Sequence, residues 1–399
     1  MVSVCMYFQV HQPFRLRKYS IFDIGNNANY FDANKNDEVL KKVASKCYIP
    51  ANNVIMDLIK RTDGKFKAAY SLSGVVLEQF EKASPDIIES FRKLVDTGCV
   101  ELLNETYYHS LSFMFSKDEF RQQVMMHNKK IKELFDVKPK VFRNTELIYN
   151  NDIAKEAQEM GFKGILAEGA DHILGWRSPN FIYRPKDLKI KLLLKNYKLS
   201  DDVAFRFGEK SWSEFPLTAP KFSQWVNKVN GNGNVVNLFM DYETFGEHQW
   251  EDKGIFEFLR HMPHEILKHP DNDFITPFEA TERYGHVAEL DVPHLVSWAD
   301  TERDLSAWLG NKMQQEAIRT LFELEKEIKE SGDLQLIDDW RKLQISDNFY
   351  YMCTKWFADG DVHKYFNPFD RPHDSFIAFM NVIQDLKIRL DKNLVEVKK

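Results

Sequence analysis

The chain has 399 residues, of which 43% are hydrophobic and 29% charged, and a formal net charge of −6. This length is enough for one large domain and a smaller one, with a sizeable buried core. The acidic balance argues against a nucleic-acid partner, which would require a basic surface. No apolar run approaches the roughly 18 residues that a membrane span needs, so we expect no membrane partner.

The first residues, MVSVCMYFQV, are typical of a strand and lack the basic segment and cleavage site of a signal peptide. The four cysteines form no CxxC pair and are Cys5, Cys47, Cys99 and Cys353. Unpaired thiols of this kind are typical of a reducing compartment. We therefore expect a cytoplasmic protein.

Strand patterns alternate with helical patterns through most of the chain. The expected strands are 2–10, 66–72, 100–104, 140–147, 164–167, 190–195 and 235–240. Expected helices include 39–61, 85–97, 116–135 and 152–160. Such alternation predicts an α/β fold with a parallel sheet, and this many repeated units favour a closed barrel. Neither GxGxxG nor GxxxxGK[ST] follows a strand, which argues against a nucleotide site.

The last part of the chain has a different pattern. From Asn311 onwards, amphipathic helical patterns replace the strands and predict a bundle of three or four helices. We therefore expect a barrel domain over residues 1–290 and a helical domain over residues 291–399.

Polar and ionisable residues follow four of the expected strands where each one ends. They are His11 and Gln12, Glu105 and His109, Arg143 and Glu146, and Asp241, Glu243 and His248. In parallel barrels the functional groups come from the carboxyl ends of the strands. Four such ends at one face of a barrel indicate a functional site.

Two chemistries could use these residues. Glu146 and Asp241, on different strands, could act as the paired carboxylates of a glycosidase, roughly 5–5.5 Å apart if the reaction retains configuration. Alternatively, His11, His109 and Asp241 could bind Zn²⁺, although the chain lacks HxxxH and HExxH spacings. The spacing of other histidines near residue 261 is typical of a solvated helix face.

Five segments, in this order, resemble the signature regions of glycoside hydrolase family 57. They are His11-Gln12-Pro13, NETYYHSL at 104–111, FRNTELIYN at 142–150, LFMDYETFGEH at 238–248 and LVSWADTERDLSAW at 295–308. The resemblance implies a (β/α)7 barrel followed by an α-helical bundle that helps to close the substrate cleft. It also implies a retaining mechanism, with Glu146 as the nucleophile and Asp241 as the general acid/base.

The same resemblance, together with the strand-end pattern, gives an expected substrate-binding set. Its members are His11, Gln12, His109, Arg143, Glu243, His248, Trp298 and Asp300. The segment YETFGEH is most similar to the α-amylase branch of the family, which implies an α-1,4-glucan or maltooligosaccharide substrate and no metal cofactor. The alternatives are 4-α-glucanotransfer, metal-dependent polysaccharide deacetylation and non-catalytic glucan binding.

Some of these residues also have a structural interpretation. Asp241 could pair with Arg143, and Glu243 could simply hold its loop. Trp298 could pack between barrel and bundle, and Asp300 could cap the helix that follows it.

Overall fold

The structure is a computed structural model and describes residues 2–355 and 366–397. Its centre is a ring of parallel strands. The ring consists of β1 (Val2–Val10), β2 (Ala68–Leu72), β3 (Val100–Leu102), β4 (Val141–Arg143), β5 (Gly164–Glu168), β7 (Lys191–Lys195) and β8 (Val235–Asp241). Each overlaps one strand expected from the sequence, which confirms the α/β barrel.

Backbone hydrogen bonds between two sheets close the ring. One sheet has the order β3-β2-β1-β8 and the other the order β4-β5-β7. A parallel bridge between Asn104 and Phe142 joins β3 to β4. On the opposite side, the Asn196 amide donates to the Asn237 carbonyl at 2.9 Å, next to β7 and β8. The carboxyl ends of all these strands therefore open on the same end of the barrel.

Short strands that the sequence analysis missed extend this framework. Strand β9 (Asn272–Phe274) pairs with the beginning of β1, and β6 (Arg184–Pro185) pairs with β10 (Glu289–Leu290). Two or three residues give too little hydrophobic pattern to be recognised in a sequence.

The side chains of β1 alternate between the two faces of the barrel wall. Val4, Met6 and Phe8 belong to the core shared with the outer helices, whereas Cys5 and Tyr7 belong to the barrel interior. Every residue of β1 is buried, because both faces of the strand are covered. The same alternation brings the last inward-facing residues of the strand to the open end of the barrel.

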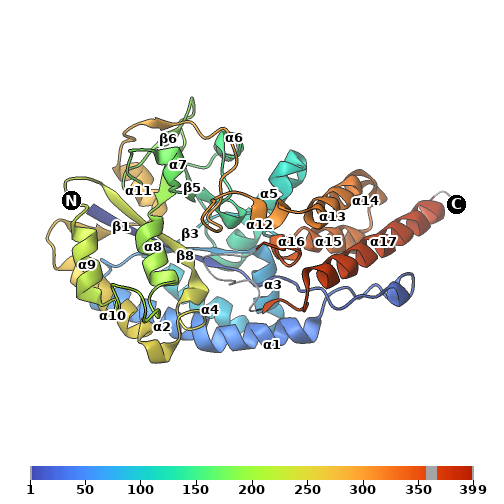
Figure 1. Cartoon of the computed structure of the whole chain (residues 1–399), viewed down its shortest axis with the longest axis horizontal. Coiled ribbons are helices and arrows are strands. Elements are labelled where there is room, and N and C mark those ends of the chain that lie inside the picture. Colours follow the sequence, from blue (N-terminus) through green and yellow to red (C-terminus); the bar gives the residue numbers. More distant parts are fainter. Residues whose placement is uncertain (1, 356–365, 398–399) are drawn as a thin grey trace.

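Helices cover the outside of the ring (Figure 1). They are α1 (Ala33–Val43), α2 (Ile49–Arg61), α3 (Gly74–Ala83), α4 (Pro85–Asp96), α5 (Lys117–Phe135), α6 (Asn151–Glu159), α7 (Asp171–Leu174), α8 (Tyr197–Ala204), α9 (Ala219–Asn227), α10 (Ile255–Leu267) and α11 (Pro277–Arg283). The expected helix over 39–61 is divided by a π-helical turn at Ala44–Tyr48. Helix α3 was not expected.

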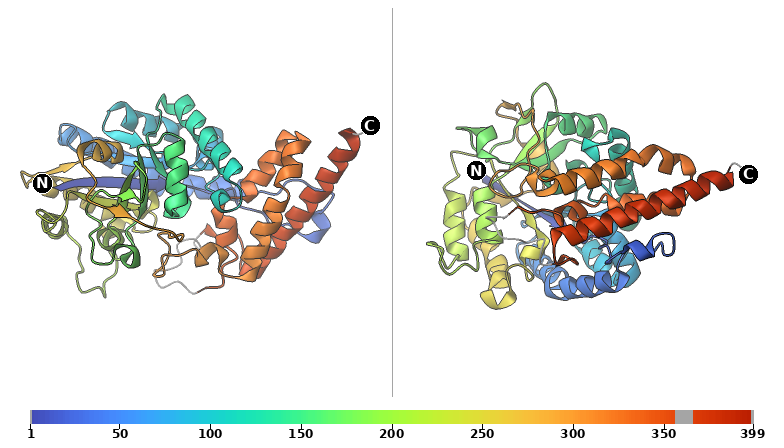
Figure 2. Two further views of the ribbon diagram at one scale, coloured as in Figure 1. Left: turned by 90° about the horizontal axis from the view of Figure 1, so that it is seen from above. Right: turned by 45° about the vertical axis from the view of Figure 1, so that its right-hand side comes forward.

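A group of helices follows the barrel and lies beside its open end (Figure 2). It contains α12 (Ser306–Leu309), α13 (Lys312–Glu323), α14 (Glu325–Ser331), α15 (Leu334–Leu343), α16 (Ser346–Tyr350) and α17 (Pro372–Val397). The loop between β1 and α1 runs along α17, where the Tyr30 hydroxyl donates to Asp385 at 2.5 Å. The described residues contain more helices here than the expected three or four, because α12 precedes the expected bundle and the amphipathic patterns break at Leu324 and Ile345.

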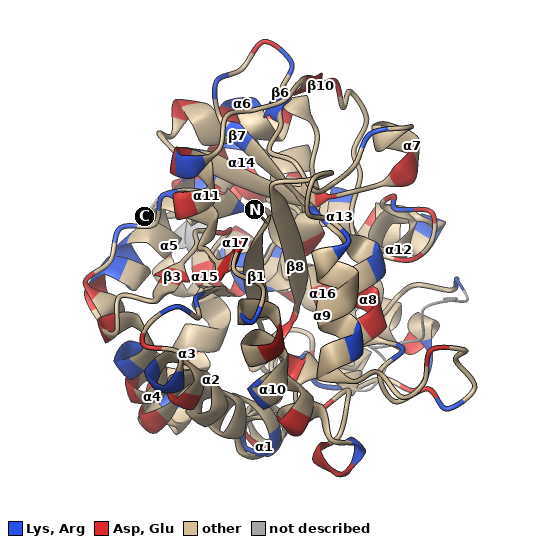
Figure 3. Cartoon of the chain, turned by 90° about the vertical axis from the view of Figure 1, so that its left-hand side faces the viewer, with Lys and Arg blue, Asp and Glu red and all other residues tan. Residues whose placement is uncertain are grey.

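The other composition-based expectations concern cysteines, membranes and charge. All four cysteines are buried, and none of them forms a disulfide within the described residues. Among the described residues, no helix is long and apolar enough to cross a membrane. Figure 3 shows Lys and Arg positions interspersed with Asp and Glu positions along the ribbon, seen from the side at which the N-terminus lies.

Candidate active site

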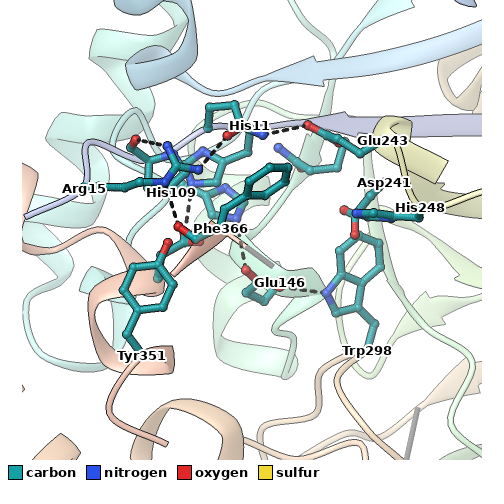
Figure 4. Close-up of a pocket in the computed structure, with 14 residues that line it drawn as sticks. His11, Arg15, His109, Glu146, Asp241, Glu243, His248, Trp298, Tyr351 and Phe366 are labelled. Carbon is teal, nitrogen blue, oxygen red and sulfur yellow. Dashed lines mark hydrogen bonds and ion pairs between the residues drawn. The ribbon is translucent and has the colours of Figure 1, made fainter. Parts of the chain in front are cut away.

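Two carboxylates face one pocket at the open end of the barrel. Asp241 is the last residue of β8, and Glu146 lies in the 3-10 turn Thr145–Leu147 just after β4. Both line the pocket, as Figure 4 shows. Glu146 is 3% exposed, whereas Asp241 is only partly buried. The strand ends thus place two acids of different exposure around one space.

Glu146 is held by contacts to both of its carboxylate oxygens. Trp298 Nε1 donates to Oε2 at 2.8 Å, and His109 Nε2 lies 3.3 Å from Oε1. The Ser346 hydroxyl, from α16, lies 3.4 Å from Oε1. The backbone of Glu146 has a left-handed φ of 56°, which turns its side chain out of the strand direction. These contacts fix the carboxylate in one orientation.

Two histidines lie face to face beside Glu146. The rings of His11 and His109 stack with centroids 4.0 Å apart and planes 21° apart. His11 Nδ1 contacts the Ser73 hydroxyl at 2.7 Å, and its Nε2 contacts Asp347 Oδ2 at 3.0 Å. Each imidazole nitrogen therefore has a partner within the protein.

Glu243 is a third carboxyl group at the site, and it differs from the pair. Burial first, and the negative charge of Asp241 second, raise the pKa of Glu243 to about 8. The Tyr48 hydroxyl donates to Glu243 Oε1, and Gln12 Nε2 donates to the same oxygen at 3.2 Å. At neutral pH Glu243 is therefore largely a neutral acid that is hydrogen-bonded into the wall of the pocket.

The structure brings most of the predicted site residues into this pocket. His11, Gln12, His109, Glu146, Asp241, Glu243, His248 and Trp298 all line it. Neither Arg143 nor Asp300 lines the pocket, and their predicted role in substrate binding stays a prediction.

Arg143 is fully buried behind Trp298. Its guanidinium carbon lies 4.9 Å from the centroid of the Trp298 ring. None of its guanidinium nitrogens has a hydrogen-bond partner within the described part of the chain. Arg143 therefore supports the back of the pocket wall through a cation–π contact.

Asp300 is paired with Lys355 Nζ at 2.8 Å. The alternative interpretation of Asp300 as a helix cap is wrong, because α12 begins at Ser306 and its N-cap residue is Leu305. Asp300 instead anchors the loop that carries Trp298.

Other residues of the pocket were missed in the sequence. They are Gln9, Arg15, Asp347, Tyr351 and Phe366. Pro13, which also lines the pocket, was noted only as part of the segment His11-Gln12-Pro13. Asp347 comes from α16 in the helical region, so the rule that functional groups follow strands could not find it. The distinguishing feature is visible only in the structure: all five residues of α16, Ser346–Tyr350, are buried, and the first three of them are polar. Consecutive polar residues in a fully buried helix indicate specific partners.

The described residues contain no group of three or more His, Cys, Asp and Glu side chains that could hold a metal ion. The predicted zinc alternative relied on His11, His109 and Asp241. The Nε2 atoms of the stacked histidines are directed to different carboxylates, Asp347 and Glu146. The two rings therefore do not converge on one ligand position.

A closed parallel barrel with paired carboxylates at the carboxyl ends of its strands defines a class of barrel that can act on glycosidic bonds. The sequence model of glycosyl hydrolase family 57 matches residues 5–293. The chain belongs to glycosyl hydrolase family 57.

Relatives and solved structures agree with this assignment. The chain is 46% identical over 405 residues to a Methanocaldococcus jannaschii protein named "Putative alpha-amylase", covering 98% of this chain and 85% of that protein. A family 57 branching enzyme from Thermococcus kodakaraensis has a TM-score of 0.65 at 16% identity, covering 88% of this chain and 85% of that one. The α-amylase AmyC from Thermotoga maritima has a TM-score of 0.63 at 12% identity, covering 100% and 94%. These two structures show a shared fold.

Proposed function

We propose that the protein is a retaining glycoside hydrolase of the α-amylase type, acting on α-1,4-glucans such as starch, glycogen or maltooligosaccharides. The observation that carries the proposal is the placement of Glu146 and Asp241 in one pocket, from different strands. Similarity to a protein named for α-amylase activity supports the choice of substrate.

The two carboxylates divide the reaction between them. Asp241 gives its proton to the glycosidic oxygen while the bond from that oxygen to the anomeric carbon breaks. An oxygen of the ionised Glu146 forms the new bond to the anomeric carbon. In the second step Asp241 takes a proton from water, the water oxygen attacks the anomeric carbon, and Glu146 leaves as a carboxylate.

The environments of the two acids support these roles. Glu146 is buried and receives two N–H···O contacts, from Trp298 and His109, which favour its ionised form. Asp241 is partly exposed, so the leaving sugar and the incoming water can reach it.

We also propose that the helical region after residue 290 contributes to the substrate cleft. Asp347, Tyr351 and Phe366 line the pocket together with the barrel residues. The site therefore draws on both parts of the chain.

The test is the product profile from maltotetraose together with the anomeric configuration of the first product by proton NMR. Retention predicts that the α-anomer appears first. Shorter oligosaccharides alone indicate hydrolysis, whereas longer ones indicate 4-α-glucanotransfer, in which a sugar hydroxyl replaces water in the second step. Initial release of the β-anomer, or no turnover of any α-glucan, would refute the proposal.

Variants assign the roles of the two acids. Both Glu146→Gln and Asp241→Asn should lower turnover of maltotetraose by about 10²- to 10⁴-fold. With α-maltosyl fluoride, whose leaving group needs no proton, Asp241→Asn should still form the glycosyl-enzyme, and Glu146→Gln should not. Glu119→Gln is the matched control, because Glu119 is a buried glutamate paired with Arg341, outside the pocket.

A further inference from the structure

A buried row of charged groups connects the end of β3 to Glu146. Glu105 follows β3 and has no exposed surface. Its Oε2 lies 2.7 Å from His109 Nδ1, and its Oε1 accepts a hydrogen bond from Gln9 Nε2 at 3.0 Å. His109 Nε2 in turn lies 3.3 Å from Glu146 Oε1. His109 thus lies between two carboxylates, one on each side of its ring.

The number of protons in this row follows from its geometry. An ionised carboxylate only accepts hydrogen bonds, and a neutral imidazole has only one N–H. With Glu105 and Glu146 both ionised, a neutral His109 would direct a lone pair at one of them. The imidazolium form has two N–H groups and satisfies both carboxylates. The geometry therefore favours a positively charged His109.

The contacts of the neighbouring His11 favour a neutral ring instead. His11 faces one carboxylate, Asp347, and one hydroxyl, that of Ser73, which can donate to the second nitrogen. A neutral ring with its proton on Nε2 meets both contacts. Burial first, and the charge of His109 second, lower the pKa of His11. Of these two rings, whose centroids lie 4.0 Å apart, only that of His109 therefore carries a positive charge.

The charges around the row favour the same protonation states, with His109 positively charged and Glu105 ionised. Burial alone would lower the pKa of His109, but Glu105 and then Glu146 raise it to about 9. Burial alone would raise the pKa of Glu105, but His109 and then Arg143 lower it to about 2. His127 of α5 accepts from the Glu105 amide and contacts the Leu72 carbonyl, and burial lowers its pKa.

The backbone at both ends of the His109–Glu146 contact is strained. His109 has a φ of 49° and Glu146 a φ of 56°, and neither residue is a glycine. Left-handed conformations of such residues cost energy and persist where surrounding contacts determine them. The row from Glu105 to Glu146 is one such set of contacts.

From this geometry we propose that Glu105 is a positioning residue for the reaction. It keeps the second proton on His109, and the Nε2–H of His109 then holds Glu146 ionised and oriented towards the anomeric carbon. The effect of Glu105 on the reaction rests on the proposed function, whereas the location of the proton on His109 does not.

Glu105→Gln isolates the charge, because glutamine has the same size and can still accept from Nδ1–H. We expect His109 to become neutral near pH 7 in this variant, since burial then dominates its pKa. The contact between His109 Nε2 and Glu146 is then no longer made by a positively charged ring. We expect kcat at pH 7 to fall about 10- to 100-fold with KM within about threefold, and the alkaline limb of kcat to move about one pH unit or more towards acid.

The proton is located directly by NMR of the full chain with ¹⁵N-labelled histidine, using His109→Gln to assign the signals. In the wild type, both ring nitrogens of His109 should be protonated at pH 7. In Glu105→Gln, only one should be. Glu119→Gln, which removes an equally buried carboxylate outside the pocket, should leave the His109 signals and the pH profile of kcat unchanged.

The outcomes separate the two proposals. A neutral His109 in the wild type at pH 7 overturns the inference, whether or not the protein cleaves glucans, and it does so even if Glu105→Gln fails to fold. An unshifted pH profile in a folded Glu105→Gln variant also overturns it. A doubly protonated His109 in a protein inactive on α-glucans supports the proton location and refutes the proposed function instead.

Discussion

The hydrogen bond between Trp298 and Glu146 leads to a sharp prediction. Trp298→Phe removes the Nε1–H that donates to Oε2 at 2.8 Å and keeps an aromatic ring for the buried Arg143. A hydrogen bond to a charged group contributes about 1.5–3 kcal/mol. At about 1.4 kcal/mol for each factor of ten, kcat on maltoheptaose should fall roughly 10- to 150-fold. The measurement is initial rate against substrate concentration, which separates kcat from KM.

Trp308 supplies the matched control. It is also buried, but its Nε1 has no hydrogen-bond partner in the described part of the chain. Trp308→Phe should therefore leave kcat within about twofold, although the smaller ring will lower the melting temperature. If Trp298→Phe had a wild-type kcat, or if its loss equalled that of Trp308→Phe, the hydrogen bond would not support catalysis.

Three further predictions concern stability. The pKa of Glu243 rises from 4.5 to about 8 on folding, so the free energy of unfolding of the wild type should fall by on the order of 5 kcal/mol as pH rises through this window; thermal unfolding of Glu243→Gln should lack that dependence. The stabilisation from the raised pKa of His109 should be complete below pH 6.5 and lost as pH rises through about 9, so a wild type and a Glu105→Gln variant with equal pH dependence would refute the ion pair. Gly246 has a φ of 110°, and an added Cβ would collide with the Lys46 carbonyl; Gly246→Ala should cost about 2 kcal/mol or more, whereas Gly285→Ala, with open space around it, should be nearly neutral in the same denaturant titration.

The strands of the barrel were predictable because each is a short apolar run ended by polar residues. The run that ends at Met240 is an example, since the sequence alone indicates where the core stops. Helix α3 was missed for a local reason. It begins at Gly74 and continues with two valines, which favour other structures, and the Ser73 side chain starts the helix by accepting from the Val76 amide.

The candidate site was predictable only as far as the rule about strand ends extends. That rule found Glu146 and Asp241, and with them His11, Gln12, His109, Glu243 and His248. Trp298 came from the resemblance to the family. It could not find Asp347, which contacts His11 across 336 positions of sequence. Nor could it give the left-handed backbone of Glu146, because the strand was expected to continue to residue 147 and ends at Arg143. Contacts of this kind depend on how the helices dock, which no local pattern encodes.

The contact between α16 and Glu146 has a consequence for how the protein is made. Ser346 lies 200 residues after Glu146, so a ribosome needs about 10–40 s to synthesise the intervening chain. Strands β5, β7 and β8 are synthesised within that interval, and the helix that supplies Ser346 and Asp347 follows only after them. The proposed active site can therefore be complete only late in biosynthesis, after α16 has been synthesised.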